Sequence, residues 1–277
     1  MTTAPRLLGA IRVHAATKTL CAARRAPQGV GGFRGGRSGA RLTRLRETVE
    51  ACRSVWRREP LVHAGREVTV PLPADLGTGL GRPLALVNRP VRGRIPIALA
   101  ALTPRAVTQA AEIAEGWMPT LFWPERCGVA WGEALAAGLG RRPPELGPLD
   151  VQVAVPVAVG GDGAVERALA KHRSRLALYL GGMGARGANF YADLARRYAL
   201  ADAAEEIQDR YLGGDRVGAA AAVPDELVHG TSLIGSAAHV RRRLTAFGDA
   251  GVTTLTLLPL ADGPERRLAD VAAALGA

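Results

Sequence analysis

A single strand–helix–strand stretch constrains the fold of this chain more than any other feature. Its apolar run, Ile95–Ala100, is too short for a helix and is typical of a strand that is buried on both faces. A helix follows at once, because Thr103 suits the N-cap, Pro104 suits the first helical position and Gly116 ends the apolar helical pattern. A second short strand is predicted over Trp117–Leu121. This order predicts a parallel βαβ unit and therefore an α/β fold.

The same alternation of strand and helix patterns continues toward the C-terminus. Strand patterns cover Val151–Val159 and Val252–Leu258. The stretch Tyr179–Tyr191, which is rich in glycine and aromatic residues, opens a helical insertion before the last strand, and long insertions commonly form lids or pocket walls. Helical patterns cover Ala40–Arg57, Pro124–Leu139, Ala164–Leu180, Ala192–Tyr198, Ala201–Leu212, Arg216–Ala222, Ala237–Phe247 and Pro264–Leu275. We therefore expect one parallel sheet with right-handed crossovers.

Residues 60–94 interrupt this alternation. Five prolines divide the segment, which limits it to turns and edge strands. A hairpin is predicted over Leu61–Val70 and a short strand over Leu84–Val87.

The basic charge of the chain is concentrated in its first 60 residues. The net charge is +11, yet these residues hold thirteen Lys and Arg against three Glu, so the remaining 217 residues are close to neutral. Residues 1–38 show no sustained apolar period and contain a Gly- and Arg-rich run, which predicts a disordered basic tail. Phe33 is the single aromatic residue of this tail and no helix-turn-helix pattern occurs, so we do not expect a nucleic-acid partner.

Composition and cysteine spacing indicate a cytoplasmic protein with a large core. With 277 residues, 48% of them hydrophobic, the chain can bury a sizeable apolar interior. Cys21, Cys52 and Cys127 lie far apart with no C-x-x-C pair, which argues against a disulfide framework or a zinc knuckle and indicates a reducing compartment. No apolar run approaches the ~20 residues of a membrane-spanning helix, and we find no signal-peptide pattern. We expect no membrane partner.

Two parallel architectures, a Rossmann sheet and a (β/α)8 barrel, fit the alternation. Gly182–Gly187 matches the dinucleotide pattern G-x-G-x-x-G. That pattern needs a preceding strand, whereas a predicted helix precedes it here. The match therefore does not support dinucleotide binding, and the barrel is favoured.

Three segments carry a resemblance to a known family. They are Ile95–Pro119 with its small-residue loop before proline, Tyr179–Tyr191 followed by Asp193–Tyr198, and Gly235–Leu258. From about Gly39 to the C-terminus, the chain resembles the luciferase-like monooxygenase superfamily, and within it the bacterial oxidoreductases that use the deazaflavin coenzyme F420. The resemblance implies a TIM-type barrel with insertions, in agreement with the alternation.

Members of this family normally have four strand–helix units before the helix that Leu42–Trp56 resembles. Residues 1–38 are too short and too rich in Gly and Arg to encode them, since each unit of a typical barrel takes ~30 residues. We therefore expect a truncated, partial TIM-type (β/α)8 barrel over residues 39–277. Its N-terminal strands are missing, a helical insertion precedes its last strand, and residues 1–38 form a separate tail.

Two groups of residues are candidates for a binding site. Cofactor-binding candidates are Ala100, Ala101, Leu102, Thr103, Met118, Pro119 and Thr120, and substrate-binding candidates are Gly182, Met183, Gly184, Arg186, Asn189 and Tyr191. The first group lies where two strands end, which is where barrels bind ligands and where helix N-termini hold phosphate. The second group combines small residues with polar side chains, as a pocket wall does.

Structural explanations compete with both assignments. From the residues alone, a capped turn explains the Ala100–Thr103 loop better than a binding site does, and packing explains Met118–Thr120 as well as a cleft does. The resemblance reverses the first judgement, because it implies that this loop lies along the phosphate-bearing side chain of the cofactor. For the substrate-binding candidates, the alternative explanation is that the glycines end a helix and the other residues pack within a lid.

The sequence offers no acid–base or metal machinery. Its histidines are isolated from one another, and no G-x-S-x-G elbow occurs. We therefore assign no catalytic residue and expect no metal. The lack of such residues suits an enzyme whose cofactor carries out the chemistry.

The resemblance implies an F420-dependent oxidoreductase that transfers a hydride between the deazaflavin and an unidentified organic substrate, a small molecule. One alternative is a luciferase-like monooxygenase that uses FMN. Another is a non-catalytic fragment whose basic tail associates with nucleic acid, for which steep salt dependence of DNA binding is the test. A homo-oligomer is compatible with all three.

Overall fold

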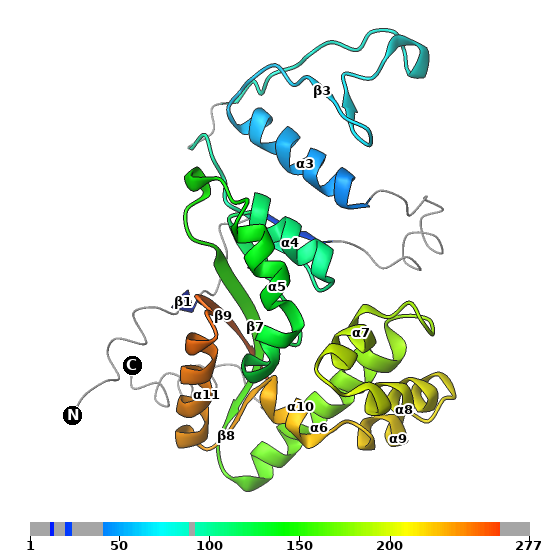
Figure 1. The fold of residues 1–277 in the computed structure, drawn as a ribbon, viewed down its shortest axis with the longest axis vertical. Helices are drawn as coiled ribbons and strands as arrows, with labels where there is room; N and C mark the ends of the chain where they lie inside the picture. The colour runs from blue at the N-terminus through cyan, green and yellow to red at the C-terminus, as the bar shows by residue number, and fades with distance from the viewer. Residues whose placement is uncertain (1–11, 14–19, 24–40, 89–91, 261–277) are drawn as a thin grey trace, which may run out of the picture.

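The computed structural model describes residues 12–13, 20–23, 41–88 and 92–260 of the chain. Its main sheet is built from β1 (Arg12–Val13), β2 (Leu20–Ala23), β5 (Ile97–Ala100), β6 (Gly116–Met118), β7 (Asp150–Val159), β8 (Leu233–Gly235) and β9 (Thr254–Pro259). The strands run in the order β1–β9–β7–β6–β5–β2, and β8 pairs with the end of β7 (Figure 1). Each pairing is parallel, which confirms the predicted α/β fold class. Within the described ranges no pairing closes this sheet into a barrel.

Two strands of the sheet come from the segment that the sequence predicts to be a disordered tail. All four residues of β2 pair with β5, and β1 pairs with β9. The prediction is therefore wrong for these two strands, while the rest of residues 1–38 lies outside the described residues. Runs of two and four residues are too short for a sequence pattern to reveal. They form strands because the backbone edges of β5 and β9 need hydrogen-bond partners.

Helices cover the sheet and build the insertion that follows β7 (Figure 1). They are α3 (Arg41–Trp56), α4 (Pro104–Ile113), α5 (Cys127–Leu139), α6 (Asp162–Ala177), α7 (Phe190–Arg197), α8 (Ala201–Leu212), α9 (Arg216–Ala221), α10 (Asp225–Gly230) and α11 (Ala237–Asp249). Except for α10, which the sequence pattern does not predict, these helices lie where helical patterns occur. The predicted closing helix Pro264–Leu275 lies outside the described residues.

Two elements near the insertion depart from ideal geometry. β6 ends at Met118, earlier than the predicted strand end at Leu121, because Pro119 has no N–H for a strand ladder and Leu121 adopts a φ of 55°. Helix α6 continues into a π-helical turn, η4 (Leu178–Gly182), where the glycine-rich stretch begins. Both departures lie close to the candidate site.

The excursion over residues 60–94 forms an arm beyond α3 (Figure 1). It contains β3 (His63–Ala64) and β4 (Thr69–Val70), an antiparallel pair that confirms the predicted hairpin. The Glu47 carboxylate on α3 accepts the backbone N–H groups of residues 66, 67 and 68 at 2.7–2.8 Å and so fixes the hairpin to the helix.

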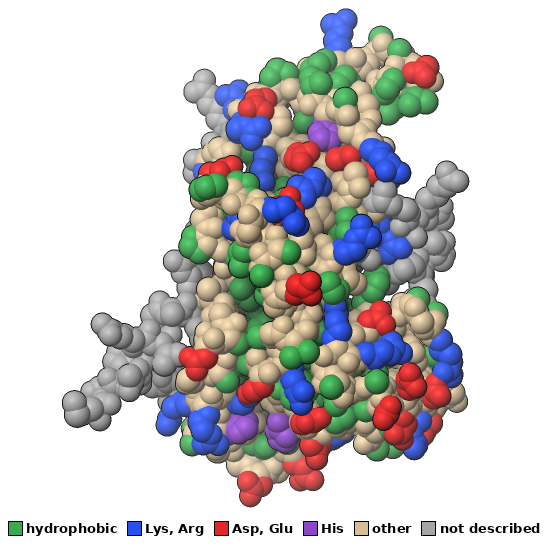
Figure 2. Space-filling model, viewed as in Figure 1, with side chains coloured by type: hydrophobic (Ala, Val, Ile, Leu, Met, Phe, Trp, Pro, Cys, Tyr) green, Lys and Arg blue, Asp and Glu red, His purple; other side chains and the backbone are tan. Residues whose placement is uncertain are grey.

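The predicted strand Leu84–Val87 in this arm is wrong. Leu84 accepts a backbone hydrogen bond from Leu61, but no strand forms there. The apolar side chains of Leu84 and Val87 are 76% and 95% exposed, so no buried face stabilises a strand at this position. Hydrophobic side chains gather at this end of the molecule (Figure 2).

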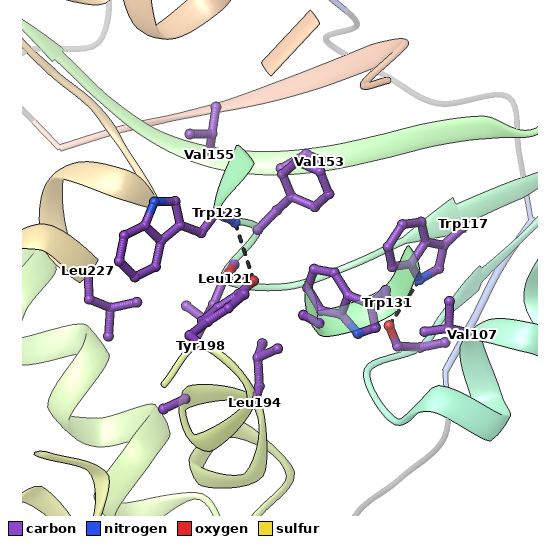
Figure 3. Close-up of a cluster of buried hydrophobic side chains, with 14 of the residues drawn as sticks. Val107, Trp117, Leu121, Trp123, Trp131, Val153, Val155, Leu194, Tyr198 and Leu227 are labelled. Atoms are coloured by element: carbon purple, nitrogen blue, oxygen red, sulfur yellow. Dashed lines mark hydrogen bonds between the residues drawn. The ribbon is translucent and has the colours of Figure 1, made fainter. Parts of the chain in front are cut away.

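An aromatic core joins the sheet to the insertion. Trp117 of β6 contacts Phe122 and Trp131, Phe122 packs in turn against Phe247, and Trp131 packs against Tyr198, with ring centroids 5.2–6.3 Å apart. Figure 3 shows Trp117, Trp131 and Tyr198 in this cluster. All five side chains are buried. Because they come from β6, the loop after it, α5, α11 and the end of α7, the strand ends and the insertion share one interior.

Candidate active site

The carboxyl ends of β5 and β6 lie side by side. In the register of the sheet, Ala100 of β5 stands opposite Met118 of β6. Because the strands are parallel, the loops that follow them leave the sheet at the same edge, where α/β proteins bind ligands. The structure therefore brings the predicted loop 100–103 next to the predicted segment 118–120.

Three side chains fix the backbone of the loop after β5. The indole N–H of Trp117 donates to the Ala101 carbonyl at 3.0 Å (Figure 3). The indole N–H of Trp131 and the guanidinium of Arg197 both donate to the Leu102 carbonyl, at 2.8 and 2.9 Å. These donors belong to β6, α5 and α7, so three elements determine the path of this loop.

Thr103 occupies the predicted N-cap position of α4 but does not cap it with its side chain. Its backbone is extended, with φ −76° and ψ 145°, and Pro104 follows as the first helical residue, as predicted. Its carbonyl accepts the N–H groups of Ala106 and Val107. Its hydroxyl Oγ1 is buried and has no hydrogen-bond partner among the described residues. The predicted side-chain cap is therefore wrong, and a polar group at the edge of the site stays available.

The loop after β6 contains a strained residue. Leu121 adopts a φ of 55°, in a region that branched side chains rarely occupy. The buried hydroxyl of Tyr198 donates to the Leu121 carbonyl at 2.9 Å and accepts the N–H of Trp123 at 3.3 Å (Figure 3). Burial is the main cause that raises the pKa of Tyr198, so the phenol keeps its proton.

The insertion supplies the third wall of a cleft of about 210 Å³ at these strand ends. Its lining residues are Ala100, Ala101, Leu102, Thr103, Ala106, Met118, Thr120, Met183, Phe190 and Tyr191. Six of the seven predicted cofactor residues and two of the six predicted substrate residues are among them. Pro119 is the cofactor candidate that does not line the cleft.

The four remaining substrate candidates have structural roles, which agrees with the lid-packing alternative. Asn189 caps α7: its side chain accepts the N–H groups of residues 191 and 192 and donates to the carbonyls of residues 179 and 180. Arg186 forms an exposed ion pair with Asp209. At Gly182 a Cβ would lie 2.5 Å from the Tyr211 ring, and at Gly184 it would lie 2.6 Å from the Asn189 backbone. Close packing therefore explains these two glycines.

Sequence reasoning missed Phe190 and Ala106 in the lining, and Arg197 and Tyr198 behind it. Phe190 could have been found, because it stands beside Tyr191 in the same aromatic stretch. Ala106 lies in the first turn of α4, directly after the predicted loop. The roles of Arg197 and Tyr198 depend on how α7 folds back over the strand ends. No local pattern encodes that contact.

The cleft is lined by small, apolar and hydroxyl-bearing side chains. Among the described residues that line it, Tyr191 alone is titratable, and burial, followed by the neighbouring Tyr179, raises the pKa of that phenol. Elsewhere, the buried His172 contacts Thr231 and lies outside the cleft.

The described residues include no group of three His, Cys, Asp or Glu that could hold a metal ion. Within the same ranges, no helix has the length and apolar character needed to cross a membrane.

Comparisons with known proteins give consistent matches. A family model described as luciferase-like monooxygenase matches residues 23–254. A protein of Mycobacterium tuberculosis that is named as a coenzyme F420-dependent oxidoreductase is 35% identical over 248 residues, which are 89% of this chain and 70% of that protein.

Solved structures with low sequence identity share the fold. A coenzyme F420-dependent tetrahydromethanopterin reductase from Methanopyrus kandleri gives a TM-score of 0.62 at 20% identity, over 84% of this chain and 61% of that protein. An F420-dependent secondary alcohol dehydrogenase in complex with an F420–acetone adduct gives a TM-score of 0.58 at 13% identity, over 88% of this chain and 64% of that protein. The chain thus spans less than two thirds of the length of these two proteins.

Proposed function

Because the chain belongs to the luciferase-like monooxygenase family, we propose that it is an oxidoreductase that uses the deazaflavin coenzyme F420 and a small organic substrate. The 35% identity over 89% of the chain to a protein named as such an oxidoreductase supports the choice of cofactor.

One observation carries the proposal: the cleft at the ends of β5 and β6 can hold a ligand, but its side chains include few groups that could catalyse a reaction themselves. The described residues of its lining carry hydroxyls and apolar groups but no carboxylate, imidazole or amine. Such a cleft orients and shields a reactive group that the cofactor supplies.

The residues present fit a deazaflavin with a phosphate-bearing side chain. The N-terminus of α4 points its positive dipole end at the cleft, where it favours an anion. The Thr103 hydroxyl has no partner within the described ranges, and the small side chains of Ala100 and Ala101 leave room for close approach. When bound, the deazaflavin would donate or accept a hydride at its ring. Met118 and Tyr191 would wall the ring and keep water from it.

Titration of the full chain with F420, followed by the fluorescence of the deazaflavin, tests the cofactor assignment. We expect saturable binding of F420 and weaker or no binding of FMN. Preference for FMN would instead favour an FMN-dependent monooxygenase of the same family. Binding of neither cofactor would overturn the proposal.

Oxidation of reduced F420 in the presence of small organic acceptors then tests turnover.

For the location of the protein, we propose the cytoplasm. The cysteines Cys52 and Cys127 are free thiols in the structure, which supports this assignment.

A further inference from the structure

We propose that Arg197 and Tyr198, adjacent residues at the end of α7, are positioning residues that hold the two strand-end loops of the cleft in their ligand-binding arrangement. Arg197 holds the loop after β5, and Tyr198 holds the loop after β6. The ligand in this inference rests on the proposed function, whereas the positioning of the loops can be measured without any ligand.

Arg197 uses its guanidinium on a backbone carbonyl. Nη2 donates to the Leu102 carbonyl at 2.9 Å, and in the part of the chain that the structure describes the buried Nε has no hydrogen-bond partner. Among the described residues no carboxylate forms an ion pair with Arg197, while its neighbour Arg196 pairs with Asp193 at 2.8 Å. The charge of Arg197 is thus directed at the loop that contains Leu102 and Thr103, both of which line the cleft.

Tyr198 bridges the strained residue of the other loop. Its hydroxyl contacts Leu121 O on one side and Trp123 N on the other, so it spans the left-handed turn at Leu121. Such a backbone conformation persists where surrounding groups over-determine it. Because Thr120 precedes this turn and lines the cleft, the Tyr198 hydroxyl fixes the position of a lining residue.

Helix α7 connects these contacts to the opposite wall. Phe190 and Tyr191 in its first turn line the cleft, and Arg197 and Tyr198 lie at its other end. Asn189 caps the helix and ties its start to η4. One short helix therefore sets the distance between the insertion wall and both loops, which determines the width of the cleft.

The hydroxyl of Tyr198 can be tested apart from its ring. The ring packs against Trp123 and Trp131, with centroids 5.5 and 6.0 Å away, and Tyr198→Phe keeps that packing. Tyr211→Phe is the matched control, because the Tyr211 ring packs on Gly181 and Gly182, away from the cleft lining.

Hydrogen exchange of the full chain without ligand gives the direct readout. In Tyr198→Phe, we expect the amides of residues 120–123 to exchange about tenfold faster than in the unmodified chain, whereas Tyr211→Phe should leave their exchange unchanged. Unchanged exchange at residues 120–123 would overturn the role of Tyr198.

Titration with F420 tests Arg197. Arg197→Ala should weaken F420 binding by about three- to tenfold, and Arg197→Lys should recover part of the affinity because it keeps a charged donor within reach of the Leu102 carbonyl. Arg196→Ala, which removes an adjacent guanidinium that pairs with Asp193, should leave the affinity unchanged. Equal affinities in Arg197→Ala and Arg196→Ala would overturn the role of Arg197.

Two results separate this inference from the proposed function. If the unmodified chain does not bind F420, the cofactor proposal fails. In that case, faster exchange at residues 101–103 in Arg197→Ala, absent in Arg196→Ala, still supports the positioning role, and unchanged exchange there overturns it. If Arg197→Ala does not fold, Arg197→Lys and Arg197→Gln provide the same comparison.

Discussion

Thr103, at the start of α4, carries a buried hydroxyl to which no other described residue donates or accepts a hydrogen bond. Thr103→Val keeps the shape of the side chain and removes the hydroxyl, so we expect the free energy of unfolding to stay unchanged or rise. A side-chain cap would instead give a loss of about 1 kcal/mol. Urea unfolding measures this difference. The same variant should bind F420 about threefold more weakly, and unchanged affinity would remove the hydroxyl from the site.

His172 makes the stability of the protein depend on pH. Burial, then the charges of Arg175 and Arg173, lowers the pKa of its imidazole to about 3. The unfolded chain takes up this proton near pH 6.5, while the folded chain resists it until about pH 3, so the free energy of unfolding decreases as the pH falls through that window.

Substitution of His172 isolates its contribution to the decrease in the free energy of unfolding at low pH. Between pH 7 and pH 5 we expect the free energy of unfolding to fall by roughly 2 kcal/mol more in the unmodified chain than in His172→Gln. Urea unfolding at the two pH values measures the difference. In His229→Gln, which removes the last of the causes that lower the pKa of His172, we expect most of the dependence to remain. Equal pH dependence in His172→Gln and the unmodified chain would contradict the burial effect.

Individual site residues could be predicted only where they follow from strand ends. The strand patterns place Ala100–Thr103 and Met118 at one edge, and the structure brings them into one cleft. Arg197 and Tyr198 could not be predicted, because their partners lie 95 and 77 residues away in the chain. A local pattern carries no information on such contacts.

At the scale of elements, the β3–β4 hairpin depends on one carboxylate of α3. Burial acts to raise the pKa of Glu47, but hydrogen bonds from the backbone N–H groups of residues 67, 68 and 66 outweigh it and the pKa is lowered. The contribution of Glu47 is therefore present at neutral pH and is lost as the pH falls through its lowered pKa.

Glu47→Gln should free the hairpin, because an amide has one acceptor oxygen and presents N–H groups to backbone donors. We expect trypsin to cut at Arg66 faster in this variant than in the unmodified chain. Glu50→Gln changes an exposed residue of the same helix and should leave cleavage unchanged. Equal cleavage in the two variants would show that the hairpin is held by other contacts.

Elements could be predicted where periodicity extends over many residues. β7 and α8 have sequence patterns that cover their full length, and the structure has them at nearly the predicted bounds. β1 and β2 are too short for such a pattern, and the strand predicted over Leu84–Val87 has no sheet to pair with. Short strands depend on their partners more than on their own residues.

For the whole molecule, the shared aromatic core predicts that the sheet and the insertion unfold together. One cluster of buried side chains includes Leu99 of β5, Trp117 of β6 and Ile207 of α8, while no described residue of the arm over 60–94 belongs to it. Thermal unfolding followed by tryptophan fluorescence and by far-UV circular dichroism should therefore give one midpoint. Hydrogen exchange should show the hairpin opening first. Global exchange of α8 before β7 would contradict a shared core.

The hydrogen bonds from the end of α7 to both strand-end loops also matter for making chimaeras with relatives. A crossover between residues 178 and 198 would join an insertion from one parent to strand-end loops from the other, and the donors at Arg197 and Tyr198 would meet loops with which they were not selected. Such hybrids should fold but bind F420 more weakly than either parent. Crossovers that transfer residues 97–198 as one block keep both pairs of contacts together, so this block is the smallest unit in which the cleft can be exchanged.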